Sequence, residues 1–232
     1  MHSILSVMPS SGPYILPLGT KSSMLSLNKL ASQIKEKELL EHYPYLADAI
    51  FQRKLEHHAG RVCAKWAIKA LNINNTSNTI SIGSKGEPIW PRGIIGSITH
   101  TQDFACAVVA PASAYIGIGI DSEKCVDEDG CADITNVCLS IKESQLLKNE
   151  LLTKCQLATL MFSTKEAFYK AAYPYVKRFI DFDELEITDI DPLSGQIYMN
   201  SDVLGSRSSF HICGRYVIRD NYVHTSVVLY KK

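Results

Sequence analysis

Residues 115–124, with the sequence YIGIGIDSEK, join an apolar run to two carboxylates. The run from Tyr115 to Ile120 predicts a short β-strand, because its isoleucines are strand formers. Asp121 and Glu123 follow at positions i and i+2, so their side chains share one face of an extended chain. Carboxylate oxygens suit a hard cation such as Mg²⁺, which keeps water or phosphate as its other ligands. The stretch indicates either a metal site or an ordinary acidic start to a loop.

The sequence after this stretch predicts helices followed by strands. Residues 127–133 are acidic and predict a loop. Helical periodicity covers residues 141–152 and 156–173, and Pro174 is expected to end the second helix. The remaining apolar runs predict strands over residues 185–190, 196–199, 209–218 and 222–230.

The second of these helices carries a pair of charged residues. Glu166 and Lys170 stand one helical turn apart. The simplest interpretation is an exposed ion pair worth about 0.3–0.5 kcal/mol. The alternative is a base and a cation presented together, as a reaction needs in which a hydroxyl loses its proton near a phosphate.

The sequence before residue 115 also predicts a helix followed by strands. From Asp48 to Leu71, apolar residues recur every three or four positions, which is typical of an amphipathic helix. Arg53 and Arg61 lie two turns apart on it, roughly 12 Å, so they could hold separate phosphates of one extended ligand. An ordinary solvated basic face is the simpler interpretation. Strands are expected over residues 80–82, 94–99 and 104–110, a turn over 72–78, and irregular or partly helical structure over 1–45.

Two short segments near these strands also carry candidate functional residues. Residues 83–88, GSKGEP, combine glycines that permit close backbone approach with the charge of Lys85, but they lack the spacing of a Walker A loop. Residues 96–100, GSITH, end a strand in the hydroxyl of Thr99 and the imidazole of His100. A lone histidine in such a place is more often a structural hydrogen-bonding group than a catalyst.

Composition narrows the class of protein. The chain has 232 residues, 46% of them hydrophobic and 21% charged, which is enough for one large domain or two small ones. Its 24 basic and 24 acidic residues cancel, which argues against a general binder of nucleic acid or anionic membranes. The 7 cysteines are odd in number and form no C-x-x-C pair, which favours free thiols in a reducing compartment. No apolar run reaches the roughly 18 residues of a membrane span. We predict a cytoplasmic protein.

The order of the predicted elements suggests two similar halves. A helix followed by strands occurs twice, with the halves meeting near residues 110–115. This order favours an α+β protein with a pseudo-twofold arrangement. We predict an N-terminal half over residues 1–113 and a C-terminal half over residues 114–232.

The motifs, taken together and in this order, resemble the 4′-phosphopantetheinyl transferases, in particular those that serve siderophore, polyketide and nonribosomal peptide synthetases. The resemblance extends from Phe51 to Thr188. It rests on AGRVCAKWAIKAL, SKGEPIWP, GSITHT, IGIDSE and FSTKEAFYKAAYPYVKRFIDFDELEIT. It implies a fold of two α/β halves, each with a small antiparallel sheet packed on a long helix.

The resemblance implies a reaction and a catalytic centre. The 4′-phosphopantetheine arm of coenzyme A would be transferred to a serine of an apo carrier protein, which releases adenosine 3′,5′-bisphosphate. Asp121, Glu123 and Glu166 would hold Mg²⁺, or Mn²⁺ in its place. Glu166 would also be the base for the acceptor serine, directly or through water. Lys170 would stabilise the α-phosphate or protonate the leaving group.

The resemblance also implies the contacts of coenzyme A, alongside Asp121 and Lys170. Its phosphates would be bound by Arg53, Arg61, Lys85, His100 and Lys165. Its nucleotide pocket would be lined by Glu87, Pro88 and Thr99. One departure is Lys65, where many relatives carry arginine, because a lysine cannot form a bidentate fork.

Two other functions remain open on the sequence. A non-catalytic module that binds coenzyme A or a carrier protein would keep the basic helix but could dispense with Glu166. A Mg²⁺-dependent nucleotide phosphodiesterase would use water as its acceptor.

For the transferase, the expected partners are acyl, peptidyl or aryl carrier domains, with no nucleic acid and no membrane. A monomer is expected because the site would form between two halves of one chain. Carrier proteins tend to be acidic, so contact is expected through Ile141, Lys142, Leu146, Leu147 and Lys148 rather than through the acidic residues before them.

Overall fold

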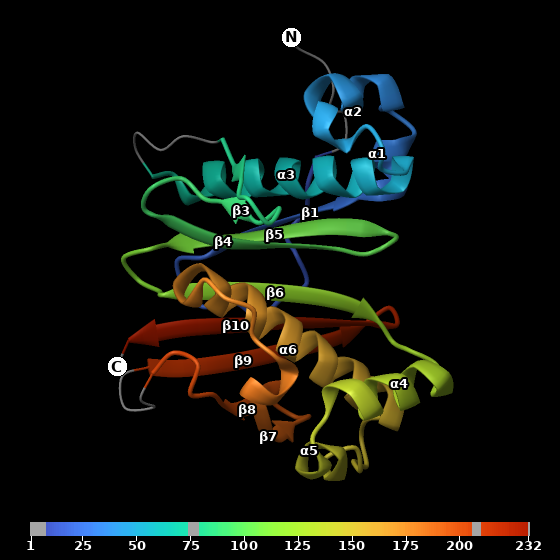
Figure 1. The fold of residues 1–232 in the computed structure, drawn as a ribbon, viewed down its shortest axis with the longest axis vertical. Helices are drawn as coiled ribbons and strands as arrows, with labels where there is room; N and C mark the ends of the chain where they lie inside the picture. Colours follow the sequence, from blue (N-terminus) through green and yellow to red (C-terminus); the bar gives the residue numbers. More distant parts are fainter. Residues whose placement is uncertain (1–7, 74–78, 206–209, 232) are drawn as a thin grey trace.

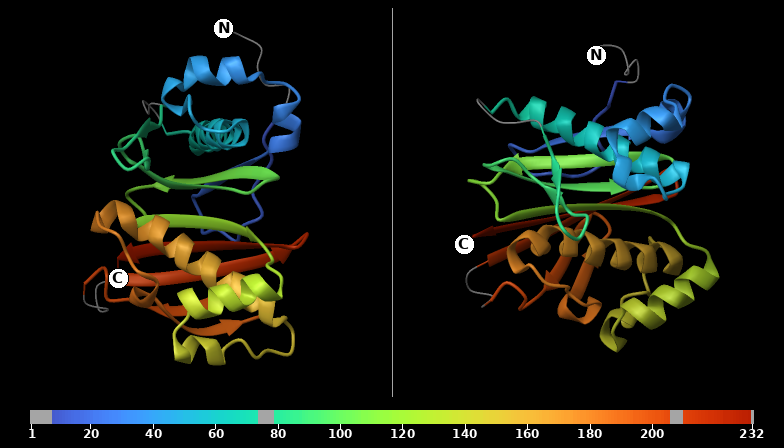
Figure 2. Two further views of the ribbon diagram at one scale, coloured as in Figure 1. Left: turned by 45° about the vertical axis from the view of Figure 1, so that its right-hand side comes forward. Right: turned by 45° about the horizontal axis from the view of Figure 1, so that its top comes forward.

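The computed structural model describes residues 8–73, 79–205 and 210–231, and its fold is mixed α+β (Figure 1). Within these residues, two larger antiparallel sheets lie face to face, and one long helix covers the outer side of each (Figures 1 and 2). The order of layers is therefore helix, sheet, sheet, helix. This confirms the predicted α+β class and the packing of each small antiparallel sheet on a long helix.

The N-terminal sheet has the strand order β1-β5-β4. These strands are β1 (Lys21–Ser26), β5 (Phe104–Pro111) and β4 (Ile94–His100). The helix α3 (Phe51–Leu71) packs on them through small and aliphatic side chains such as Leu55 and Ala59. The shorter elements of this part are α1 (Leu27–Ala31), α2 (Glu36–His42), η1 (Pro44–Leu46), and the paired strands β2 (Ser81–Ile82) and β3 (Pro88–Ile89).

The C-terminal sheet has the strand order β6-β10-β9-β8-β7. Its strands are β6 (Gly117–Lys124), β7 (Glu186–Asp191), β8 (Gln196–Asn200), β9 (Phe210–Arg219) and β10 (Tyr222–Lys231). The helix α6 (Lys154–Val176) lies on β6 and β10, and a capping box between Thr153 and Gln156 begins it. The connecting elements are α4 (Glu128–Cys138), α5 (Ile141–Gln145) and η2 (Phe182–Glu184).

The two sheets share an apolar interior. Side chains of β5, β6 and β10 form a core cluster between the sheets, which includes Val108, Ile118 and Val228. At the edge of this cluster the backbone N–H of Ile120 donates to Ser97 Oγ at 3.1 Å. This hydrogen bond joins β6 to β4, so the end of β4 is held beside the acidic residues of β6.

Two glycines allow α6 to approach β6 closely. A Cβ on Gly119 would lie 1.9 Å from the carbonyl oxygen of Ala167, and one on Gly117 would lie 2.1 Å from that of Ala171. No side chain fits into such a gap, so glycine is required on the strand where the helix crosses it. The close approach brings the turn of α6 around Glu166 next to Asp121.

Most predicted elements are present, but several bounds differ. A strand is present at β1, where the sequence predicted irregular structure, since it gains its hydrogen bonds from the distant β5. The strand β6 continues through Asp121 and Glu123 instead of ending before them. The helix α6 continues past Pro174 to Val176, because a long packed helix tolerates the loss of one hydrogen bond. Residues 74–78 of the predicted turn lie outside the described residues.

The acidic segment after β6 is a helix, so the predicted loop is wrong. Asp127 is the N-cap of α4, and its side chain accepts a hydrogen bond from Gly130 N at 3.0 Å. Glu128 and Asp129 occupy the first turn, where the helix dipole favours negative charge. The helix predicted over residues 141–152 is limited to α5.

Among the described residues, no helix is both long and apolar enough to cross a membrane.

Candidate active site

Asp121 is the centre of the candidate active site. Its carboxylate is almost completely buried on β6. Oδ1 accepts hydrogen bonds from Lys170 Nζ at 2.6 Å and from Thr99 Oγ1 at 3.1 Å. Oδ2 accepts one from Ser163 Oγ at 2.9 Å. Because Lys170 and Ser163 belong to α6 and Thr99 to β4, Asp121 joins the two parts of the molecule in one network.

Glu123 and Glu166 lie close enough to Asp121 for its negative charge to affect the pKa of each. Burial, and then repulsion by Asp121, raises the pKa of Glu123 to about 7. Burial also raises the pKa of Glu166, with Asp121 adding to the shift and Lys170 opposing it. The strand with GIDSE and the helix with KEAFYK therefore come together, and their three carboxylates form one electrostatic group.

This donor set fits a hard divalent cation. Burial and repulsion both disfavour charge on Glu123 and Glu166, and a bound cation would relieve the repulsion. In the described part of the chain, no three His, Cys, Asp or Glu side chains converge closely enough to form a metal site by themselves. Mg²⁺ takes only one or two carboxylates in many phosphate-handling sites and completes its shell with water and phosphate oxygens. Asp121, Glu123 and Glu166 would hold the ion here, one or two of them directly and the rest through its water shell.

The helix α3, in the N-terminal part of the chain, contributes a cation to the same region. Arg53 Nη1 donates to His100 Nε2 at 2.7 Å, and Glu56 lies 3.5 Å from the same guanidinium. His100, at the end of β4, is within electrostatic range of both Lys170 and Asp121. Arg53 and His100 therefore lie near the Asp121 network.

Arg61 lies further along the same face of α3. Its Nη1 donates to His57 Nδ1 at 3.1 Å, and the other ring nitrogen of His57 bonds to Tyr45 OH at 2.7 Å. The side chain is 9% exposed, yet its Nη2 meets no acceptor among the described residues. A buried guanidinium with an unused donor favours an anionic ligand at this place.

The GSKGEP loop between β2 and β3 is stabilised by a glutamate within the loop itself, Glu87. The Glu87 carboxylate accepts the backbone N–H of Lys85 at 3.0 Å, and Gly86 has φ 84°, which suits glycine. This leaves the Lys85 side chain exposed. Burial raises the pKa of Tyr169 on α6, and the charge of Glu87 adds a smaller part, so the loop extends toward that helix. Pro88 follows as the first residue of β3.

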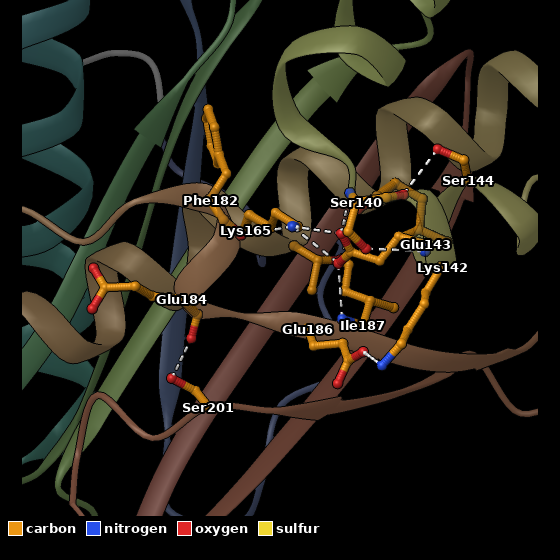
Figure 3. Close-up of polar contacts among 12 residues, drawn as sticks. Ser140, Lys142, Glu143, Ser144, Lys165, Phe182, Glu184, Glu186, Ile187 and Ser201 are labelled. Atoms are coloured by element: carbon orange, nitrogen blue, oxygen red, sulfur yellow. Dashed lines mark hydrogen bonds and ion pairs between the residues drawn. The ribbon is translucent and has the colours of Figure 1, made fainter.

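Lys165 has partners of its own, different from those of Arg53, Arg61 and Lys85. Its Nζ lies 2.9 Å from Glu143 and donates to the carbonyl oxygen of Phe182 at 2.7 Å (Figure 3). Both members of this ion pair are buried. The charge of Lys165 is therefore already balanced inside the protein by Glu143, and its predicted contact with a coenzyme A phosphate stays a prediction.

An apolar cavity adjoins Glu166. Its volume is about 230 Å³, and most of its wall is aromatic or aliphatic. The lining residues include Tyr169 on α6 and the segment from Phe179 to Phe182 that follows the helix. The site therefore has a charged part around Asp121 and an apolar part beside Glu166.

The sequence pattern did not point to two residues of the Asp121 network. Ser163 stands three residues before Glu166 and seven before Lys170, so helical spacing places it on their face and could have revealed it. Thr225 pairs with Asp121 across β10 and β6, and its Oγ1 lies 2.8 Å from Ser163 Oγ. No local signal reveals Thr225, because it is brought there by strand pairing alone.

Carboxylates from β6 and α6 lie near Arg53 of α3 and His100 of β4, an arrangement that suits a phosphate-bearing substrate. Comparison with known proteins identifies the family. Residues 41–110 match the family model described as 4′-phosphopantetheinyl transferase N-terminal domain, and residues 117–227 match that of the 4′-phosphopantetheinyl transferase superfamily.

Individual relatives agree with these matches. The chain is 30% identical to the 4′-phosphopantetheinyl transferase Npt of Nocardia iowensis, over 92% of this chain and 97% of that protein. It is 29% identical to the 4′-phosphopantetheinyl transferase PptT of Mycobacterium tuberculosis, over 82% and 86%. It is 35% identical to enterobactin synthase component D of Salmonella typhimurium, over 61% and 58%. The chain therefore belongs to the 4′-phosphopantetheinyl transferase superfamily, which confirms the resemblance seen in its sequence and its assignment as a transferase of this type with coenzyme A as substrate.

Proposed function

We propose that this enzyme transfers the 4′-phosphopantetheine arm of coenzyme A to a serine of an apo carrier protein in a reaction that depends on Mg²⁺. The observation that carries the proposal is the meeting of Lys170 and Thr99 on Asp121, at 2.6 and 3.1 Å. One carboxylate is thereby held by the helix that presents Glu166 and by the strand that ends in His100. A substrate phosphate at this place would contact acid, amine and imidazole groups together.

The chemical step exchanges one phosphorus–oxygen bond for another. The serine oxygen forms a bond to the phosphorus that carries the pantetheine arm, and the anhydride bond to the second phosphate breaks. Adenosine 3′,5′-bisphosphate leaves with the electron pair. Glu166 accepts the serine proton, directly or through water, as the general base. Lys170 would stabilise the charge of the leaving phosphate. Mg²⁺ on Asp121, Glu123 and Glu166 would neutralise the pyrophosphate oxygens.

We place the nucleotide end of coenzyme A along α3. The unused Nη2 of Arg61 and the exposed Lys85 would supply donors for phosphates, and Arg53 would do so beside His100. Glu87, Pro88 and Thr99 would border the nucleotide pocket. Lys165 is left out of this set because Glu143 occupies it.

We place the pantetheine arm in the apolar cavity beside Glu166. The arm is uncharged and begins at the phosphorus that is attacked, so it must leave the charged centre on one side. The cavity of about 230 Å³ starts at Glu166 and is lined by Tyr169 and Phe179. An aromatic wall of this kind suits a neutral, flexible chain better than a phosphate.

The partners we propose are acyl, peptidyl or aryl carrier domains of siderophore, polyketide or nonribosomal peptide synthetases. The similarity to a protein named as an enterobactin synthase component supports the siderophore type. Ile141 is 85% exposed and stands next to the exposed Lys142, which together offer an apolar and basic contact for an acidic carrier. Leu147 is buried, so it would support this surface from inside the protein and would not contact the carrier itself. We further propose two halves, residues 1–113 and 114–232, in a cytoplasmic monomer.

The test is intact-mass spectrometry of an apo carrier protein incubated with this enzyme, coenzyme A and Mg²⁺. The carrier should gain the mass of one phosphopantetheine arm. The gain should disappear with EDTA and fall by about 10²–10⁴ in rate with the variant Glu166→Gln, since a general base contributes about that much.

The control is Lys124→Gln, at the exposed end of β6, which should leave the rate unchanged. Circular dichroism should show that both variants fold. Full activity of Glu166→Gln, or of the enzyme in EDTA, would contradict the proposed roles. Hydrolysis of coenzyme A without any carrier would instead favour a phosphodiesterase.

A further inference from the structure

Glu143 is a buried glutamate outside the proposed catalytic centre. It stands on α5, and its side chain is 2% exposed. Its carboxylate accepts hydrogen bonds from the backbone N–H groups of Ser140 at 2.8 Å and Ile187 at 2.9 Å (Figure 3). Each of its oxygens also lies 2.9 Å from Lys165 Nζ. One carboxylate therefore ties α5 to β7 and to the middle of α6.

Lys165 carries this connection to the cavity beside Glu166. Besides Glu143, its Nζ donates to the carbonyl oxygen of Phe182 at 2.7 Å. The ring of Phe182 packs near that of Phe162, with centroids 6.0 Å apart, and its segment forms one wall of the cavity. Lys165 therefore anchors the backbone of this wall to α6, on the residue directly before Glu166.

The lysine can act as this anchor only while Glu143 balances its charge. A buried ammonium without a partner is strongly disfavoured, so it would turn toward solvent. This change removes its hydrogen bond to Phe182. The wall from Phe179 to Phe182 would then lose its attachment, while the Asp121 network would keep all its own partners.

We propose that Glu143 is a positioning residue for the pantetheine arm of coenzyme A: it holds Lys165, and through Lys165 the wall of the cavity that receives the arm. This inference rests on the proposed function, in which that cavity binds the arm. It assigns Lys165 to the shape of the cavity instead of to a phosphate.

The structure offers a matched control on the same elements. Lys142 and Glu186 form an ion pair at 3.2 Å between α5 and β7, one residue away from Glu143 and from Ile187 (Figure 3). This second pair is exposed and does not reach Lys165. Glu186→Gln therefore removes a carboxylate between the same two elements without touching the anchor.

The experiment compares two ligands by isothermal titration calorimetry. Coenzyme A contains the arm, whereas adenosine 3′,5′-bisphosphate contains the nucleotide without it. In Glu143→Gln, the Kd of coenzyme A should rise roughly tenfold, because the ligand must now order the wall itself. The Kd of adenosine 3′,5′-bisphosphate should stay within about twofold, and kcat should change less than the KM of coenzyme A. Glu186→Gln should change neither Kd.

A second variant covers the case in which Glu143→Gln does not fold. Combining Glu143→Gln with Lys165→Met removes both buried charges, a change that proteins commonly tolerate, and keeps an amide oxygen that can accept a backbone N–H at this place. It also removes the hydrogen bond to Phe182, so coenzyme A binding should remain weak while nucleotide binding persists.

Equal weakening of both ligands in Glu143→Gln, or the same effect in Glu186→Gln, would overturn the proposal, since either would indicate a general structural role. Coenzyme A affinity equal to wild type in the double variant would overturn it as well. If wild-type enzyme transfers the arm but Glu143→Gln keeps the normal ratio of affinities, this inference alone fails. If wild-type enzyme transfers nothing, the proposed function fails with it.

Discussion

At the scale of the residue, Asp121 illustrates how hydrogen bonds and one opposite charge stabilise a buried carboxylate. Its two oxygens meet Lys170, Thr99 and Ser163, so burial is offset by three hydrogen bonds and one opposite charge. Glu123 and Glu166 have less compensation, and burial raises the pKa of each. The three acids therefore have different tasks available to them, because their surroundings differ and not their chemistry.

Lys170→Ala tests the amine at this centre. We expect kcat to fall by about 10²–10³, because a donor aimed at the developing charge of the leaving phosphate is lost. Coenzyme A affinity should change less, since Arg53 and Arg61 remain. Steady-state kinetics and calorimetry measure the two quantities. A variant that binds coenzyme A weakly but turns over normally would make Lys170 a binding residue only.

At the scale of the element, the crossing of α6 over β6 decides the geometry of the site. Gly119 and Gly117 remove the side chains that would separate the helix from the strand. Ala167 and Ala171 face them with small side chains, and they stand directly after Glu166 and Lys170. Small residues on both elements therefore set the distance at which the proposed catalytic side chains meet.

Gly119→Val tests this contact. Its Cβ would lie 1.9 Å from the carbonyl oxygen of Ala167, which is backbone and cannot turn aside. We expect a loss of at least about 3 kcal/mol in the free energy of unfolding, at the upper end for overpacked sites. Chemical denaturation measures it. Lys124→Ala, on an exposed position of the same strand, should cost little, and an equally stable Gly119→Val would refute the packing argument.

At the scale of the whole molecule, the two sheets form one interior, and the site lies where β4 and β6 meet. Ser97, Thr99 and Tyr14 each place a hydroxyl against β6 from the N-terminal part of the chain. The cations of α3 are therefore held in place against the acids of β6. Separating the halves would divide the site as well as the core.

The stability of the whole molecule should depend on pH through two histidines of α3. Burial, followed by the charge of Arg61, lowers the pKa of His57 to about 4. Burial, followed by His42, lowers that of His58 to about 4. The unfolded chain binds protons here near pH 6.5, whereas the folded chain stays neutral until about pH 4. The stability contributed by the neutral rings is therefore present above about pH 6.5 and is lost as the pH falls toward 4.

Thermal unfolding between pH 7 and 4 measures this dependence. For one fully buried histidine the free energy of unfolding would fall by about 1.4 kcal/mol per pH unit, and both rings are partly exposed, so the effect of each should be smaller. His58→Gln should reduce the slope, whereas the exposed His211→Gln should not. A slope that His58→Gln leaves unchanged would assign the acid sensitivity to other groups.

The sequence could predict features that depend on neighbours along the chain. The period of the apolar residues located α3 and α6, and the i, i+4 spacing put Glu166 and Lys170 on one face. Predictions from local sequence were wrong where the same amino-acid composition occurs in two kinds of structure. The acids after β6 cap and begin α4, although acidic runs also form loops.

The sequence by itself determined the helices that carry the charged side chains, the order of the motifs and, through them, the family. Only the tertiary structure decided which charges meet. Lys165 and Lys170 belong to one motif, yet the first is buried against Glu143 and the second reaches Asp121. Burial and partners are set by elements far away in the chain, such as α5 and β6, and no spacing within the motif contains that information. The pairing of β10 with β6 likewise brings Thr225 next to Asp121, because strands that are far apart in the sequence can form hydrogen bonds with each other.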